Sequence, residues 1–288
     1  MNATAGRGRA YIRSMRVLLF LAAACSLTAS DDPREIVRRA VERLDQNLKV
    51  ARNYTFLERT ETRELDSNGR VKSRKVQLYD VTLLEGSPYR RLVGKDDHPL
   101  SADEERKEQQ KLDESIAQRR KETPEQRAKR ISDWENRRRK DREPLKEIPD
   151  GFDFRITGNE EVEGRDTWVI EVTPRPDYKA RTREAKFFPK FRGTMWIDKA
   201  ENQWVKTSAE VTDNISIGLF LARLNKGARM DAEMTLVNGE VWLPKHIEAK
   251  GSGRIALLKT LRIDEDTTYS NYRKFQSDSR IVATAPVP

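Results

Sequence analysis

The chain has 288 residues, enough for one large domain whose apolar core needs neither disulfides nor metals. Charged and hydrophobic residues each make up 36%, and five Trp among them exclude a fully disordered polymer. The net charge is +9, but the first 30 residues alone carry four basic and no acidic side chains. Because nucleic-acid binding needs basic residues concentrated on one folded surface, this charge does not predict a nucleic-acid partner.

Residues 1–30 have the pattern of an export signal. Four arginines precede an uncharged run from Val17 to Cys25, and small residues follow. The run is too short to span a bilayer as a helix. Met15 directly precedes the last of these arginines and is an alternative start. We therefore expect a periplasmic protein.

Cys25, the single cysteine, ends the apolar run and follows three alanines. This context resembles a bacterial lipobox, in which the cysteine is acylated before cleavage. Lipidation would anchor the chain in the outer membrane, and it competes with ordinary cleavage after Ser26 or Ser30. Either way the mature chain has no disulfide, which is typical of a bacterial envelope protein with a self-sufficient core.

An amphipathic helix is predicted directly after the signal, over residues 33–50. Asp32 is its expected N-cap, Pro33 fits the first turn, and Glu35 completes a capping-box arrangement. The apolar residues recur at helical spacing and form one stripe: Ile36, Val37, Ala40, Val41, Leu44 and Leu48. We expect this stripe to pack on the chain's own domain.

The sequence then alternates between strand and helix signals. Strands are predicted over 53–65, 71–84 and 89–93, with a hairpin turn at 66–69. Residues 101–147 contain 28 charged residues in 47 and no glycine, which predicts a helical insertion with a second helix starting at Thr123-Pro124. Its basic cluster Arg137 to Lys140 is expected to be a solvated face.

Antiparallel strands are predicted after residue 151. The expected ranges are 152–156, 167–173, 193–198, 204–212, 230–237, 241–249 and 254–275, with turns at 159–164, 199–202, 238–239 and 251–253. The loop 175–191 is long enough to be functional or mobile. The apolar stretch 213–230 is a buried strand or short helix, or an apolar flap. The expected fold is α+β, a strongly curved antiparallel sheet with a helical insertion, and 281–288 is a loose tail.

Residues suited to catalysis are few. His98 lies in a predicted loop beside two aspartates, and His246 lies on a predicted strand. No metal-binding or nucleotide-binding spacing is present, so neither zinc nor another cofactor is expected. A hydrolase would require Asp264, Asp266 and His246 to converge in a cleft. We therefore predict a non-enzymatic protein.

Three segments carry a resemblance to a known superfamily: Gly158 to Val172, Gly193 to Asp198, and Val241 to Lys245. With the export signal and capped helix, they resemble the periplasmic carriers of the outer-membrane lipoprotein-sorting system. The resemblance covers about 31–95 and 151–275 and leaves out the 101–147 insertion. It implies an incomplete β-barrel over residues 31–280, binding acyl chains without covalent chemistry, with helix 33–50 and the insertion as candidate lids.

The resemblance also implies an apolar cavity lined by large side chains of the strands and the 213–230 stretch. The candidates are Trp168, Ile170, Trp196, Trp204, Leu219, Phe220, Met230, Met234 and Trp242. The expected partner is a lipid or lipoprotein acyl chain, with a possible envelope protein bound by the 101–147 helices, no nucleic acid, and membrane association only through Cys25. The alternative is a lipid-anchored scaffold or interaction protein whose cavity is filled by its own side chains.

Overall fold

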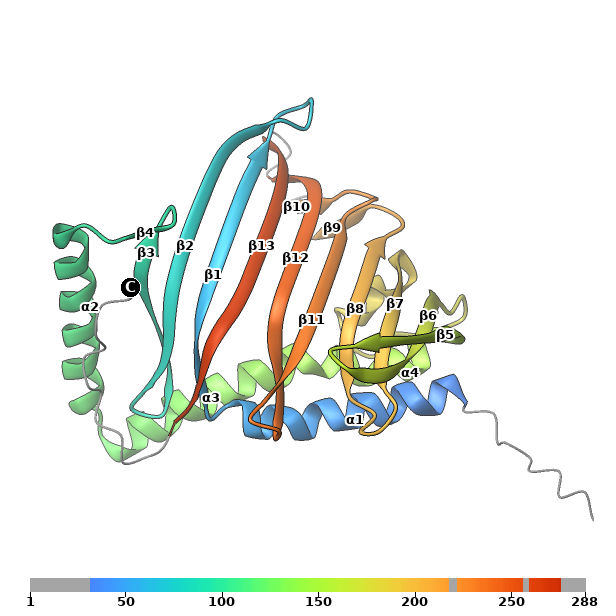
Figure 1. Ribbon diagram of the computed structural model, residues 1–288, viewed down its shortest axis with the longest axis horizontal. Coiled ribbons are helices and arrows are strands. Elements are labelled where there is room, and N and C mark those ends of the chain that lie inside the picture. The colour runs from blue at the N-terminus through green and yellow to red at the C-terminus, as the bar shows by residue number, and fades with distance from the viewer. Residues whose placement is uncertain (1–31, 218–221, 256–258, 276–288) are drawn as a thin grey trace, which may run out of the picture. The chain divides into compact units, whose positions relative to one another are not determined.

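The computed structural model describes residues 32–217, 222–255 and 259–275. They form one large antiparallel sheet with helices, and the sheet is not closed into a barrel (Figure 1). The predicted α+β fold class is therefore confirmed. The export signal, Cys25 and the tail 281–288 lie outside the described residues, and the domain limits 31–280 stay a prediction.

Thirteen strands of the described residues make up the sheet, in the spatial order β4-β3-β2-β1-β13-β12-β11-β8-β7-β6-β5, with β9 and β10 attached beside β12. Their bounds are β1 Tyr54–Leu65, β2 Val71–Leu84, β3 Ser87–Lys95, β4 His98–Pro99, β5 Phe152–Val162, β6 Arg165–Pro174, β7 Phe191–Asp198, β8 Trp204–Val211, β9 Ile215–Ile217, β10 Ala222–Leu224, β11 Arg229–Val237, β12 Val241–Ile255 and β13 Lys259–Lys274. Most neighbours are consecutive hairpins, as the turn signals predict.

One pairing joins distant parts of the sequence. β1 pairs with β13 along most of its length, from Tyr54 opposite Lys274 to Glu64 opposite Ile263. The sheet is thus two antiparallel meanders, one before and one after the helical insertion, joined by their first and last strands (Figure 1). No local signal specifies such a pairing, because its loop closure spans most of the chain.

The helix α1 (Pro33–Ala51) follows the predicted bounds. The Asp32 carboxylate caps it by accepting a hydrogen bond from the backbone N–H of Arg34 at 3.0 Å. The expected capping box is wrong in one respect, since this bond goes to the second helical residue and not to Glu35. Four residues of the predicted stripe are buried, namely Ile36, Val37, Ala40 and Val41. The stripe therefore packs on the domain, as expected.

The insertion forms two long helices, α2 (Ala102–Arg120) and α3 (Pro124–Arg142), followed by a 3-10 turn (Glu143–Glu147) and α4 (Ile148–Gly151). Both long helices start with a reciprocal capping box, Ser101 with Glu104 and Thr123 with Gln126, which explains the sharp boundary at Pro124. Polar contacts hold them to the sheet. Arg119 donates to the carbonyl oxygens of Leu84 at 2.6 Å and Ser87 at 3.1 Å.

The glycines at 251 and 253 do not form the expected turn. β12 runs through Gly251-Ser252-Gly253 to Ile255, and β13 begins only at Lys259. A Cβ atom on Gly253 would lie 2.3 Å from the backbone oxygen of Arg223 in β10. Glycine is therefore needed here for the close approach of β10, a tertiary reason that the turn signal could not reveal.

Two further expectations need correction. β5 continues to Val162, so the turn that follows is confined to Glu163 and Gly164 instead of starting at Asn159. The loop 175–191 contains a 3-10 helix (Ala185–Lys190) and is tied to Glu147, which accepts backbone N–H bonds from Arg181 and Thr182, each at 2.8 Å. The apolar stretch 213–230 contains β9 and β10, and its middle, 218–221, lies outside the described residues.

Candidate functional site

The covered face of β6 and β7 carries the main apolar cluster. Alternate residues of β6 point to this face, so Trp168 and Ile170 lie on it together, and Trp204 of β8 packs against the same cluster. The apolar stripe of α1 packs against this cluster, and Ile170 is 0% exposed. Three of the candidate lining residues are thus brought together, under α1, in a space filled by the chain's own side chains.

Asn47 fastens the C-terminal part of α1 to β12. Its side-chain amide donates to the carbonyl oxygen of Trp242 at 2.5 Å and accepts from the backbone N–H of Trp242 at 2.7 Å. At the other end, the Arg34 guanidinium lies 3.0 Å from the Asp153 carboxylate and also bonds the carbonyl of Pro149. These polar contacts hold α1 over the apolar cluster at both ends.

The other candidate lining residues lie elsewhere. Trp196 alternates with the clustered Met195 and Ile197 and so lies on the opposite face, where its indole N–H donates to Glu160 at 2.6 Å. Trp242 is buried, with the Arg165 guanidinium over its ring.

Met230, on β11, is 45% exposed, and Met234 on the same strand is half-buried. Leu219 and Phe220 lie outside the described residues. The structure does not gather all the candidates into one lining, and their role stays a prediction.

Three aromatic rings form a cluster on β1 and β13 that the sequence did not predict. The Phe56 ring centroid lies 5.7 Å from that of Tyr269 and 5.6 Å from that of Tyr272. Burial raises the pKa of Tyr269 to about 12. The β1–β13 pairing creates this cluster, so alternation within either strand alone could not have revealed it.

An ionic network surrounds Glu61 of β1, whose side chain is 11% exposed. Three guanidinium groups lie within 3.1 Å of its carboxylate, those of Arg59, Arg63 and Arg74. Hydrogen bonds from Arg74 and then Arg63 outweigh burial and lower the pKa of Glu61 to about 2. The network is saturated with opposite charges and is a structural feature of the sheet.

The groups considered for hydrolysis converge only in part. His246 Nε2 lies 2.8 Å from a carboxylate oxygen of Asp266 across β12 and β13. Asp264 is two residues away on β13, and His98 is exposed in β4, far along the chain from this pair. Within the described ranges no group of three His, Cys, Asp or Glu side chains is placed to hold a metal ion.

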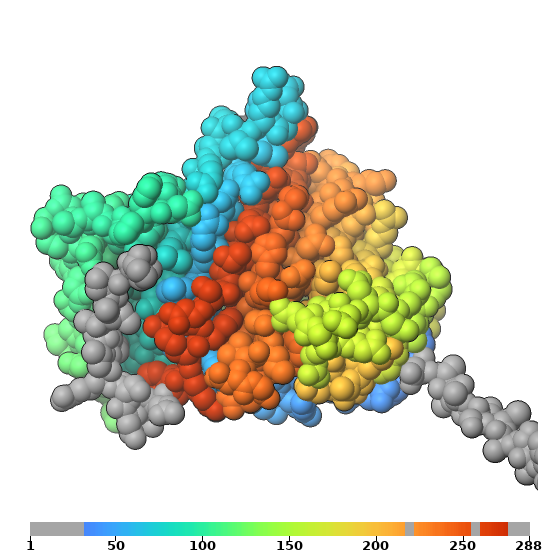
Figure 2. Space-filling model, in the orientation of Figure 1, coloured from blue at the N-terminus to red at the C-terminus, as the bar shows by residue number. Residues whose placement is uncertain are grey.

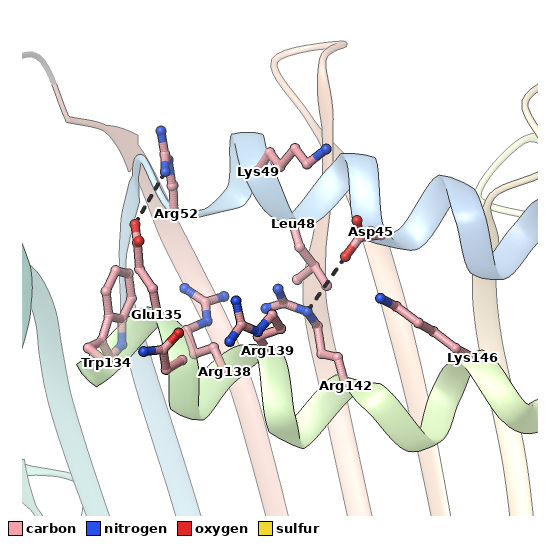
Figure 3. Close-up of a pocket in the computed structure, with 11 residues that line it drawn as sticks. Asp45, Leu48, Lys49, Arg52, Trp134, Glu135, Arg138, Arg139, Arg142 and Lys146 are labelled. Atoms are coloured by element: carbon pink, nitrogen blue, oxygen red, sulfur yellow. Dashed lines mark hydrogen bonds and ion pairs between the residues drawn. The ribbon is translucent and has the colours of Figure 1, made fainter. Parts of the chain in front are cut away.

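A cleft of about 330 Å³ lies between α1 and α3 (Figure 3). We call it the basic cleft, and the residues that line it are Asp45, Leu48, Lys49, Arg52, Trp134, Glu135, Asn136, Arg138, Arg139, Arg142 and Lys146. The two helices run antiparallel, because Arg52 pairs with Glu135 at 3.4 Å and Asp45 pairs with Arg142 at 4.0 Å. The basic run was expected to form a solvated face. Arg137, Arg139 and Lys140 are exposed, whereas Arg138 is half-buried, and Arg138 and Arg139 line the cleft opposite α1.

No protein-family model matches the sequence, and no curated protein matches it. Solved structures do. A putative outer membrane lipoprotein-sorting protein domain from Vibrio parahaemolyticus is 13% identical, with a TM-score of 0.34, over 85% of this chain and 95% of that one. A LolA superfamily protein from Nitrosomonas europaea is 10% identical, with a TM-score of 0.31, over 85% and 94%.

A DUF1329 family protein from Desulfovibrio piger is 11% identical, with a TM-score of 0.32, over 86% of this chain and 95% of that one. The similar structures therefore include members of the superfamily that the sequence resembles. Among the described residues, no helix combines the length and the apolar character needed to cross a membrane.

Proposed function

We propose that this chain is a non-enzymatic, exported envelope protein that binds a lipid or lipoprotein acyl chain on the face of β6, β7 and β8 that α1 covers. One observation carries the proposal. The apolar stripe of α1 lies directly on Ile170, with Trp168 and Trp204 beside it. In this proposal α1 is a closed lid, and an acyl chain takes the place of its stripe.

The free energy lost by exposing the stripe of α1 is comparable to the free energy gained by burying an acyl chain. Exposing Ile36, Val37 and Val41 costs roughly 5 to 9 kcal/mol, taking about 1.5–3 kcal/mol for each buried aliphatic side chain. An acyl chain that buries about ten methylenes gains roughly 8 kcal/mol at about 0.8 kcal/mol each. An ordinary membrane acyl chain is therefore long enough to balance displacement of the helix.

The test uses two tryptophans on the covered face and one on the opposite face. Native mass spectrometry of the envelope-purified protein is expected to show retained lipid, and a fluorescent fatty acid is expected to bind the purified chain. Trp168→Ala and Trp204→Ala should each weaken probe binding by about tenfold, the equivalent of one lost apolar contact. Trp196→Ala is the matched control and should leave the affinity unchanged.

Two results would overturn the proposal. One is a protein that retains no lipid and binds no probe. The other is an equal loss of probe binding in all three tryptophan variants, which would mean that the probe adheres to the sheet without using the covered face.

A second candidate function is favoured by the same cluster, because its space is already filled by side chains of the chain itself. In that case the protein is an envelope scaffold, anchored through Cys25, that binds another protein through α2 and α3. Absence of lipid, together with palmitate labelling that Cys25→Ala abolishes, would favour this alternative.

A further inference from the structure

The basic cleft has an excess of positive charge among its lining residues. Six of its lining side chains are basic, namely Lys49, Arg52, Arg138, Arg139, Arg142 and Lys146, whereas only Asp45 and Glu135 are acidic. Around Glu61, by contrast, each of the three guanidinium groups has a carboxylate at ion-pair distance. The cleft therefore holds a positive charge that the chain does not neutralise.

The two carboxylates of the cleft lie at its ends. Glu135 accepts from Arg52 at one end, and Asp45 lies 4.0 Å from Arg142 at the other. Between them, among the residues that the structure describes, Arg138 and Arg139 have no carboxylate at ion-pair distance. Figure 3 shows these guanidinium groups in the space between the two helices.

Two observations indicate that these arginines lack a ligand. The Nε atom of Arg142 is buried and has no hydrogen-bond partner in the described part of the chain. Burial, and then the positive charge of Arg142, lower the pKa of the Arg138 guanidinium below its usual value. Buried donors are normally paired, so a bound anion would accept from the Nε–H of Arg142 and offset the positive charge that Arg142 places beside Arg138.

We propose that the basic cleft binds a phosphoryl group through Arg138, Arg139 and Arg142, with Lys49 and Lys146 at its rim. Guanidinium groups bind phosphate oxygens through two parallel hydrogen bonds, and several of them converge here. A volume of about 330 Å³ is at the lower end of the range of small-molecule sites, which begins at about 300 Å³. It accommodates a diphosphate or a phosphorylated headgroup.

The cleft does not favour a nucleic acid. Single-stranded nucleic acids bind on free aromatic faces that stack successive bases. Trp134, the aromatic residue of the cleft, already has the Arg138 guanidinium over its ring, 5.0 Å from the centroid. The inference does not rest on acyl-chain binding, because none of the three arginines belongs to the cluster under α1. The two are nevertheless coupled, because α1 forms one wall of the cleft.

The test compares two double variants of the same basic run. Arg138→Gln/Arg139→Gln removes two charges that line the cleft, and Arg137→Gln/Lys140→Gln removes two exposed charges that do not. Isothermal titration calorimetry with sodium pyrophosphate at about 0.15 M salt reports binding under screened conditions. We expect the first variant to weaken binding by at least about tenfold and the second to change it less than about twofold.

Sedimentation with vesicles separates the two sources of the phosphoryl group. If phosphatidylglycerol vesicles bind, phosphatidylcholine vesicles do not, and pyrophosphate competes, the ligand is a lipid headgroup. If pyrophosphate binds and neither kind of vesicle does, the ligand is a soluble phosphate compound. Three results overturn the proposal: no binding of either probe, an equal loss in both double variants, or tighter binding of a short single-stranded oligonucleotide than of pyrophosphate.

Discussion

In two regions of the sheet, alternate residues of the strands point to one face, but those residues are apolar in one region and charged in the other. In the covered half, β5 to β8, alternate side chains are apolar and pack under α1, with Ile170 and Ile197 fully buried. In the ionic half, β1, β2 and β13, alternate positions hold the charges around Glu61, and strands of 12, 14 and 16 residues are mostly half-exposed. The helix accounts for the difference, since the apolar stripe of α1 packs on the covered half, whereas only its last residues, Val50 and Ala51, reach the end of β1 near Tyr54.

The two regions are expected to contribute differently to the stability of the fold. Burial of apolar area is the dominant favourable contribution to folding, so the covered half is expected to dominate the free energy of unfolding. Charged pairs near the surface contribute less and depend on pH and salt. The two halves should therefore respond differently to substitution and to acid.

The largest expected effect is in the covered half. Ile170→Ala should lower the free energy of unfolding by about 2–5 kcal/mol, because the substitution leaves a cavity under α1. Val71→Ala on β2, where the side chain is 55% exposed, should change it by less than about 0.5 kcal/mol. Urea unfolding at pH 7 measures both. Similar losses in the two variants would contradict the division of the sheet.

The ionic half predicts a loss that depends on pH. Glu61→Gln should reduce stability by about 1–3 kcal/mol at pH 7, because three guanidinium groups lose their carboxylate. The folded pKa of Glu61, about 2, lies below its ordinary value of 4.5, so the stabilisation is complete above pH 4.5 and is lost as pH falls toward 2. Urea midpoints of the two proteins should converge over that interval, and a constant difference would argue against the network.

A third substitution probes the close packing of neighbouring strands in the covered half. Gly193→Ala on β7 places a Cβ atom 2.3 Å from the backbone oxygen of Ser208 on β8, and should cost about 1–3 kcal/mol. Gly158→Ala on β5 meets no atom within 4 Å and is the matched control. Thermal unfolding of the pair distinguishes them. A tolerated Gly193→Ala would mean that β7 and β8 are spaced more widely.

The smallest effect is expected outside both halves, at the start of α3. Thr123→Ala removes the hydroxyl that accepts from the backbone N–H of Gln126 and should cost about 1 kcal/mol. Because α3 has no buried residues, hydrogen exchange in its first turn should accelerate while β6 and β7 are unaffected. Faster exchange in those strands would show that the insertion supports the covered half.

Local signals in the sequence were sufficient to predict where most helices, strands and turns lie. The Asp32 cap, the Thr123-Pro124 start and the Asn238-Gly239 turn each act within a few residues, and each lies where it was expected. Non-local features were missed. The β1–β13 pairing and the approach of β10 to Gly253 depend on segments far apart in the chain.

For the same reason, the sequence predicted only in part which face of the sheet each candidate residue lies on. Alternation correctly placed Trp168 and Ile170 on one face, but it could not show that Trp196, on the next strand, lies on the other. The basic cleft was missed because the charges were counted over the whole 101–147 insertion, where 15 basic and 13 acidic residues nearly balance, although residues 124–142 alone carry eight basic and four acidic residues. Only the antiparallel packing of α1 beside α3 brings their basic side chains together (Figure 3).

One face of the sheet offers a reference for hydrogen-exchange measurements on the covered face. Strands β1, β13 and β12 lie side by side on the face toward the viewer without a helix over them (Figure 2). Amides of these strands away from α1 serve as an internal reference, because displacement of α1 would uncover β6 to β8. The N–H of Trp242 is left out of this reference, because it donates to Asn47 of α1.

Hydrogen exchange of α1, measured with and without a saturating fatty acid, tests the lid directly. The account predicts that the amides of residues 33–51 exchange faster when the acyl chain is bound, while the strands β6 and β7 keep their protection. Unchanged or slower exchange of α1 in the loaded protein would contradict the claim that the acyl chain takes the place of the helix.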